Sequence, residues 1–202
     1  MTTDDVFLAL PTERHAVTPA YSVRSTVLIS SMRGLRACGR FDHYVDALEP
    51  AYRDAMLSIT AGLWFPIDVA LAHYRACDRL DMDLAALQKV GFESGRYINQ
   101  NVLKVLLRLS RDAGLSPWSA LAQTNRLVAR LWQGSAIEVR RLGPKEARME
   151  WVGQPCASSP YFATAFASFV EGILTLFCQR AYVRLLARPS DAETLFYRAQ
   201  WA

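Results

Sequence analysis

The stretch Leu63-Trp-Phe-Pro-Ile-Asp-Val-Ala-Leu-Ala-His-Tyr-Arg-Ala-Cys-Asp-Arg-Leu80 contains the clearest helix start in the chain. Pro66 suits the first turn of a helix, because that turn requires no N–H from it. Asp68 places a negative charge at the same end, where it interacts favourably with the helix dipole. Apolar residues then return at helical spacing, so we expect a helix over residues 66–80 with one buried face.

The buried face of this helix carries a mixed chemical cluster. His73 and Cys77 lie four residues apart on it, a spacing that two metal ligands or a histidine-activated thiolate could use. The sequence offers no second ligand pair, no oxyanion site and no orienting acid. We therefore expect no metal site, no catalytic residues and no enzymatic activity. A core-edge histidine beside a buried thiol is the preferred interpretation.

The composition is that of one folded domain. The 202 residues are 51% hydrophobic and 21% charged, and the net charge of +4 neither requires nor excludes an acidic partner. The four cysteines form no C-x-x-C pair, which is typical of reduced thiols. Asp4 and Asp5 stand where a signal peptide needs positive charge, and no apolar run reaches about 18 residues. We expect a cytoplasmic protein without a membrane span.

The clearest strand pattern is a β-hairpin. Residues 137–142 alternate in polarity, Gly143-Pro144-Lys145-Glu146 makes a tight turn, and residues 147–152 return. The remaining patterns predict a strand over 25–30, helices over 41–48, 50–60, 116–133 and 161–179, a long helix that is capped by Asp81 or Asp83 and runs to about 113, and closing strands over 182–186 and 193–201.

This order of elements predicts an α+β fold. A helical N-terminal two-thirds packs on an antiparallel sheet that is formed by hairpin, helix and hairpin. Residues 1–20 are expected to form an N-terminal arm or an added strand. Residues 21–202 are expected to form a single ligand-binding-like domain.

The long helix contains two glycines four residues apart, Gly91 and Gly95. Each costs a helix roughly 1 kcal/mol against alanine, so close approach of another backbone or of a ligand is expected there. Core packing explains each aromatic residue taken alone. Together with the glycines, however, the aromatics predict an apolar pocket, with Arg96 meeting an acidic head group. The expected ligand-binding residues are Trp64, His73, Tyr74, Cys77, Gly91, Gly95, Arg96 and Trp118.

Two arginine clusters are interpreted as solvated faces or ion-pair networks, because nucleic-acid binding calls for a higher charge and interleaved aromatics. We therefore expect no nucleic-acid partner. The phenylalanine row of the 161–179 helix and the apolar closing strands favour a homodimer. The clusters are Arg33, Arg36 and Arg40, and Arg126, Arg130, Arg140, Arg141 and Arg148.

Several short motifs between residues 25 and 202 carry a resemblance to a known superfamily. The chain resembles the heme-NO-binding, 4-vinyl-reductase and TRAPP-like domains, and most of all a bacterial branch of them. The motifs are Trp64-x-Pro66, His73-Tyr74-x-x-Cys77-Asp78, Gly91-Phe92, Gly114-x-x-Pro117-Trp118, Leu131-Trp132-x-Gly134, Gly143-Pro144-Lys145-Glu146-Ala147 and Tyr197-x-x-x-Trp201.

The resemblance implies a domain that binds a ligand or a partner, and it does not fix which one. Heme-binding members use a proximal histidine and a Tyr-x-Ser-x-Arg motif. This chain has Tyr21-Ser22-Val23-Arg24-Ser25, which has another spacing and lies at the other end, so we expect no cofactor. Two functions remain open. One is a sensor domain that holds an apolar or amphipathic small molecule, and the other is a structural adaptor that acts on a protein partner through its surface.

Overall fold

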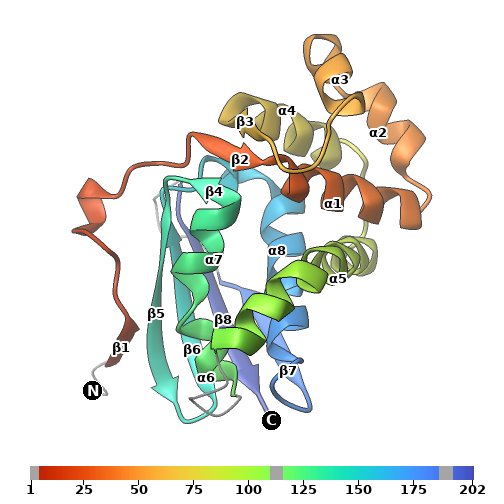
Figure 1. Ribbon diagram of the computed structural model, residues 1–202. Helices are drawn as coiled ribbons and strands as arrows, with labels where there is room; N and C mark the ends of the chain where they lie inside the picture. The colour runs from red at the N-terminus through yellow and green to blue at the C-terminus, as the bar shows by residue number, and fades with distance from the viewer. Residues whose placement is uncertain (1–4, 110–115, 187–192) are drawn as a thin grey trace.

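A five-stranded antiparallel sheet, with the strand order β1-β5-β6-β8-β7, carries helices on one face (Figure 1). The computed structural model describes residues 5–109, 116–186 and 193–202, and it describes only the backbone of Arg96 and of residues 98–109. The predicted α+β fold, a helical N-terminal part on a sheet of hairpin, helix and hairpin, is confirmed. The strands of this sheet are β1 (Asp5–Leu8), β5 (Ala136–Gly143), β6 (Glu146–Val152), β7 (Ala181–Leu185) and β8 (Leu195–Trp201).

Helices α1 to α4 form the upper part of the molecule in Figure 1, while α6, α7 and α8 lie along the sheet. A second, three-stranded sheet with the order β3-β2-β4 joins these two parts, and the sequence patterns did not predict it. None of the helices in the described ranges is both long and apolar enough to cross a membrane. The helices are α1 (Ser25–Ala37), α2 (Phe41–Ala47), α3 (Pro50–Leu57), α4 (Ile67–Asp78), α5 (Leu84–Leu109), α6 (Pro117–Leu121), α7 (Thr124–Leu131) and α8 (Pro160–Leu174), and the strands of the second sheet are β2 (Ser22–Arg24), β3 (Trp64–Pro66) and β4 (Trp132–Gln133).

The two hairpins pair as predicted, β5 with β6 and β7 with β8. Ile137 on β5 pairs with Trp151 on β6, which in turn pairs with Leu195 on β8. All three side chains are buried, since the alternation of each strand directs them to the face that the helices cover. The residues between the two predicted closing strands, 187–192, lie outside the described residues.

The prediction of a strand over 25–30 is wrong, because these residues form the first turns of helix α1. The β-branched residues of this segment favour a strand locally. Leu28, Met32 and Leu35, however, recur at helical spacing and are buried on one face of α1. The strand lies just before the helix, at Ser22–Arg24. Tertiary burial therefore overrides local propensity here.

The predicted helix over 116–133 is broken into α6 and α7. Ser116 caps its start as expected, since its hydroxyl accepts the N–H of Ser119. The break lets Asn125 reach β5, where its side chain accepts from the N–H of Ile137 at 2.7 Å and donates to the same residue's carbonyl at 2.9 Å. This two-sided contact sets the direction of α7. Two further boundaries also differ from expectation: α4 begins at Ile67 after the short strand β3, and α8 ends at Leu174. Helix α5 begins at Leu84 with Asp83 as its cap, which is one of the two predicted caps.

Helices α5 and α8 meet at Gly91. A Cβ at this position would overlap the carbonyl oxygen of Ala165, so the two backbones are in direct contact. The close approach expected from the glycine pair is therefore made by another backbone. A hypothetical Cβ at Gly95 would lie 3.3 Å from the ring of Phe169, a tight contact that a small shift of this side chain would relieve.

Four arginines form a row across the sheet face that is turned away from the helices. They are direct cross-strand neighbours on β5, β6, β8 and β7, an arrangement that destabilises a sheet unless the charges are compensated. Glutamates on the same face compensate three of them. The pairs are Arg140 with Glu138, Arg148 with Glu150 and Arg198 with Glu146, and the fourth arginine is Arg184.

The Glu150→Gln substitution is expected to lower the free energy of unfolding by about 1–2 kcal/mol at pH 7. The carboxylate side chain is 4% exposed and accepts from both Arg14 and Arg148, each at 2.8 Å. Burial raises the pKa of Glu150, but the hydrogen bonds from these arginines outweigh it, so the pKa lies below its usual value. Denaturant unfolding at several pH values measures the effect.

Because the folded pKa of Glu150 is lowered, its contribution is complete above the unfolded pKa of about 4.3 and is lost as the pH falls through the folded value. The difference between wild type and Glu150→Gln should therefore shrink in acid. Glu138→Gln is the matched control with a smaller expected loss, because among the described residues Glu138 pairs with Arg140 alone. Equal losses in the two variants at pH 7 would contradict the assigned role.

Candidate functional site

Helix α4 carries the mixed cluster into the interior. His73, Tyr74 and Cys77 are all buried, and the ring of His73 is fully enclosed. Its Nδ1 lies 2.8 Å from the hydroxyl of Tyr44 on α2, and its Nε2 lies 2.9 Å from the hydroxyl of Ser31 on α1. The histidine therefore joins three helices through both ring nitrogens.

One direction of the hydrogen bonds around His73 gives every hydroxyl an acceptor, because the Tyr161 hydroxyl also hydrogen-bonds to the sulfur of Cys77. Within the described chain the buried Tyr44 hydroxyl bonds only to His73, so it has an acceptor only if it donates to Nδ1. The Nε2–H then donates to Ser31, and Ser31 donates to the hydroxyl of Tyr161 at 2.7 Å. Burial lowers the pKa of His73 to about 3, which keeps the ring neutral in this chain of bonds.

Cys77 lies beside this network, with its sulfur 3.7 Å from Nε2 of His73. Burial raises the pKa of the Cys77 thiol well above its usual value, so the pair is a neutral histidine beside a protonated thiol. An activated nucleophile has the opposite electrostatics. Among the described residues, no group of three histidine, cysteine, aspartate or glutamate side chains could hold a metal ion.

A small apolar cavity of about 60 Å³ lies next to the hydrogen-bonded network. Helices α1, α4, α5 and α8 form its walls, and Leu131 and Trp132 close it where α7 meets β4. None of the described side chains that line it is charged. The hydroxyls of Ser31 and Tyr161 connect the cavity wall with His73. The lining also includes Val27, Ser30, Tyr74, Val90, Gly91, Ser94, Phe162, Ala165, Phe166 and Phe169.

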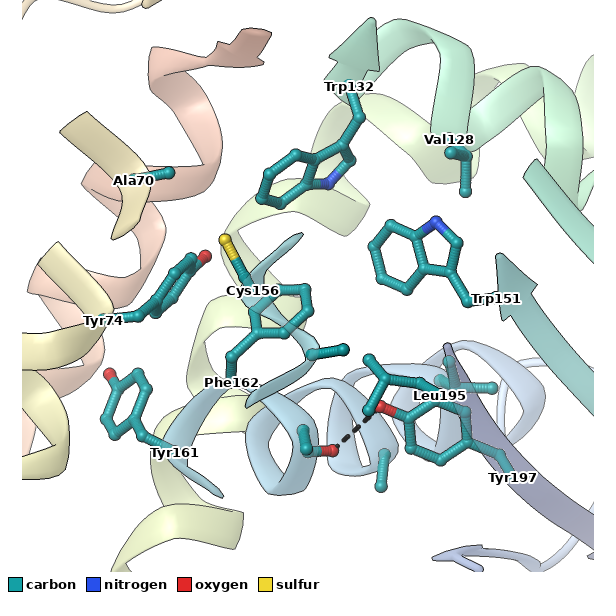
Figure 2. Packing of buried hydrophobic residues seen from close by; sticks show 14 of the residues in the cluster. Ala70, Tyr74, Val128, Trp132, Trp151, Cys156, Tyr161, Phe162, Leu195 and Tyr197 are labelled. Atoms are coloured by element: carbon teal, nitrogen blue, oxygen red, sulfur yellow. Dashed lines mark hydrogen bonds between the residues drawn. The ribbon is translucent and has the colours of Figure 1, made fainter. Parts of the chain in front are cut away.

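A second apolar cavity, of about 50 Å³, lies between α6, α7, α8 and β6. It shares Leu131, Trp132, Phe166 and Phe169 with the first cavity, so these four side chains form the partition between the two. Figure 2 shows Trp132 beside Trp151, with ring centroids 5.8 Å apart, and Phe162 near both. The space between the helices and the sheet is thus largely filled by aromatic rings.

The structure brings together only some of the residues predicted to bind a ligand. Tyr74 and Gly91 line the first cavity, and Gly95 lies behind Phe169 of the partition. His73 and Cys77 lie behind its polar wall.

The other three predicted residues lie elsewhere or are not described. Trp64 is on β3 under the guanidinium of Arg24, which lies 4.2 Å from the ring centroid. Trp118 packs against Phe7 and Trp201 at the end of the sheet, and its Nε1 donates to the carbonyl of Pro144. The side chain of Arg96 is outside the described residues, and so is Gly114 of the resemblance.

The sequence patterns missed the polar wall of the cavity. Ser30 ends the strand that was predicted over residues 25–30 and Ser31 follows it, so the patterns gave neither residue its position on α1. Once α1 is a helix, the small polar residues among its buried positions are the signal that could have found them. Tyr161 is the first residue of the predicted helix over 161–179, and the sequence pattern assigns no function to its hydroxyl.

Neither protein-family models nor curated protein sequences match this chain. Solved structures do match it. An H-NOX structure from work on heme distortion in the H-NOX family has a TM-score of 0.61 and 13% identity, over 88% of this chain and 94% of that chain. The Fe(II) unliganded H-NOX protein from K. algicida has a TM-score of 0.59 and 9% identity, over 89% and 96%. An oxygen-binding H-NOX domain related to soluble guanylate cyclases has a TM-score of 0.58 and 12% identity, over 88% and 94%.

The chain has the H-NOX fold. At these identities the match concerns the fold alone, and it agrees with the resemblance carried by the short motifs. The match extends from the helical N-terminal part through the five-stranded sheet, so both parts that border the cavities belong to the shared fold.

Heme is the group that the H-NOX fold implies, and the residues of this chain do not fit it. His15 and His43 are exposed, and both ring nitrogens of His73 are already hydrogen-bonded. Arg24, the only arginine of the Tyr21–Ser25 segment, donates to the carbonyl of Gly62 on the surface. The two cavities are also far smaller than the roughly 300–1,000 Å³ of a cofactor site.

Proposed function

We propose that this chain is a non-enzymatic sensor domain that binds a small apolar molecule in the two cavities between its helices and its sheet. The observation that carries this proposal is the first cavity, which is apolar and lies where the helical part meets the part that contains the sheet. Solved structures of the same fold include a domain described as oxygen-binding, and a small ligand is compatible with the size of this cavity.

The cavity is placed so that a ligand could alter the packing of two helices. Gly91 of α5 and Ala165 of α8 are in backbone contact and also line the cavity. A guest molecule that contacts both helices favours one spacing over others, and such differential contact is what shifts a conformational equilibrium. The wall residue Tyr161 continues the effect into the His73 network.

A non-enzymatic role is supported by the chemistry beside the cavity. Burial keeps the His73 ring neutral, with its lowered pKa, and the Cys77 thiol protonated, with its raised pKa. Neither is prepared for proton transfer or nucleophilic attack near pH 7. A cytoplasmic location remains part of the proposal.

Xenon is the probe that tests the cavity, because it enters small dry apolar cavities without hydrogen bonds. Titration of the purified protein, followed by the ¹²⁹Xe NMR shift, should give saturable binding in the wild type. Val27→Phe places a ring in the cavity from α1 and should abolish it. Ile29→Phe on the same helix is the matched control, since Ile29 lines neither cavity.

Wild-type protein without saturable xenon uptake would overturn the proposed function. Equal uptake in Val27→Phe and the wild type would place the bound gas elsewhere. Folding of each variant is checked by its thermal transition, so that a lost signal is not the result of an unfolded protein.

A structural adaptor is the alternative function, and apolar residues around the edge strand β7 favour it. Tyr182 is 60% exposed, Leu176 44% and Leu185 38%. Such residues are used in contacts with partners or with a second copy. The homodimer stays a prediction. Light scattering coupled to size-exclusion chromatography tests it, with Tyr182→Glu expected to shift a dimer to a monomer.

A further inference from the structure

We propose that the ligand of the first cavity is a neutral molecule with a single oxygen function, which it hydrogen-bonds to the hydroxyl of Tyr74. This inference rests on the proposed function and names the chemical class of its ligand. It is carried by a buried hydroxyl without a partner and by a lining without charge.

Tyr74 is 4% exposed, yet its hydroxyl makes no hydrogen bond within the described part of the chain. Figure 2 shows its ring reaching from α4 toward Phe162 and Cys156, with the oxygen at the far end. Two other buried polar atoms in the described chain lack partners and are completely enclosed, Arg53 Nε and Gln154 Nε2. The Tyr74 oxygen is not among these enclosed atoms, and Tyr74 is one of the residues that line the first cavity.

An unpaired buried hydroxyl is costly, and a ligand oxygen in the cavity would remove that cost. The neighbouring tyrosine differs in this respect. The Tyr161 hydroxyl is already bonded to Ser31 at 2.7 Å. Tyr74 is therefore the hydroxyl in this wall that is available to a guest.

The ligand is neutral because the described cavity lining contains no charged side chain that could compensate an ion. Burial of an unpaired charge is far more expensive than burial of an unpaired hydroxyl. A carboxylate, a phosphate or an ammonium group is therefore excluded from this wall, whereas an alcohol, a phenol or a ketone is compatible with it.

The size of the ligand follows from the partition between the two cavities. Rotation of Leu131, Phe166 and Phe169 would join volumes of about 60 and about 50 Å³. The joined space approaches the roughly 150 Å³ of an apolar cavity that binds benzene. A single small ring with one oxygen is thus the largest guest expected.

Phenol and benzene are matched probes for this inference, because they differ by the hydroxyl alone. Calorimetric titration of the wild type should show phenol binding about fivefold more tightly than benzene. This ratio corresponds to the net free energy of one hydrogen bond. Tyr74→Phe should bind both with equal affinity. Because this variant removes an unpaired hydroxyl, it should fold at least as stably as the wild type.

Tyr161→Phe is the control within the same wall, and it should keep the preference for phenol. Equal affinities for phenol and benzene in the wild type would overturn the inference, as would a preference that survives in Tyr74→Phe or is lost only in Tyr161→Phe. Binding of neither ring would also overturn it. Xenon uptake by the same protein, tested separately, then decides whether the cavity function itself stands.

Discussion

The Gly91→Ala substitution is expected to lower the free energy of unfolding by about 3 kcal/mol or more. The new Cβ would overlap the carbonyl oxygen of Ala165. A backbone atom cannot relieve this overlap by a change of rotamer, as a side chain could. Helices α5 and α8 would have to separate at their closest point. The loss outweighs the roughly 1 kcal/mol that alanine gains over glycine in a helix. Urea or thermal unfolding followed by circular dichroism measures it.

Two glycines on the same pair of helices serve as controls. At Gly95 the added Cβ would meet a flexible ring, Phe169, at 3.3 Å, and at Gly172 it would meet Phe92 at 3.7 Å. Both alanine variants should therefore stay within about 1 kcal/mol of the wild type, with Gly172→Ala neutral or more stable. If Gly91→Ala were as stable as Gly172→Ala, the direct backbone contact between α5 and α8 would be refuted.

Acid is expected to destabilise the protein through His73 more than through any other histidine. The folded pKa of about 3 lies below the unfolded value of about 6.5, so the unfolded chain takes up a proton that the folded chain does not bind. The free energy of unfolding should therefore fall as the pH drops below about 6.5. Its slope is about 1.4 kcal/mol per pH unit, down to about pH 3.

His73→Gln removes this slope, since glutamine does not titrate. At pH 7 the variant should be less stable than the wild type by about 2–3 kcal/mol, because Tyr44 and Ser31 lose an aligned buried partner. The two stability curves should therefore converge as the pH falls. The control is His43→Gln on the exposed side of α2, which should keep the wild-type slope. A His73→Gln curve parallel to the wild type between pH 6.5 and 4 would exclude a neutral buried histidine.

Elements with a strong local pattern were predictable from the sequence. The hairpin of β5 and β6 follows from alternating residues around Gly143-Pro144-Lys145-Glu146, and the start of α6 follows from Ser116 and Pro117. Residues 25–30 show the limit of this reasoning. Their composition favours a strand, whereas burial of Leu28 against the rest of the core makes them helical.

The candidate site was predictable only in part. The spacing of His73, Tyr74 and Cys77 indicated one face of one helix, and α4 has that face buried. The partners of His73, however, are 29 and 42 residues away in the chain, on α2 and α1. No local pattern encodes such contacts, so the neutral state of the ring could not be read from its neighbours in the sequence.

By itself, the sequence determined the α+β class, the hairpin and the need for a close contact at Gly91, because periodicity, turn chemistry and the cost of glycine in a helix are local properties. Only the tertiary structure decided that a backbone makes this contact, and that among the described residues Tyr74 alone has an unpaired hydroxyl in the cavity lining. These features depend on how α1, α4, α5 and α8 pack together. Packing of this kind is set by the whole core at once and not by any single stretch of the chain.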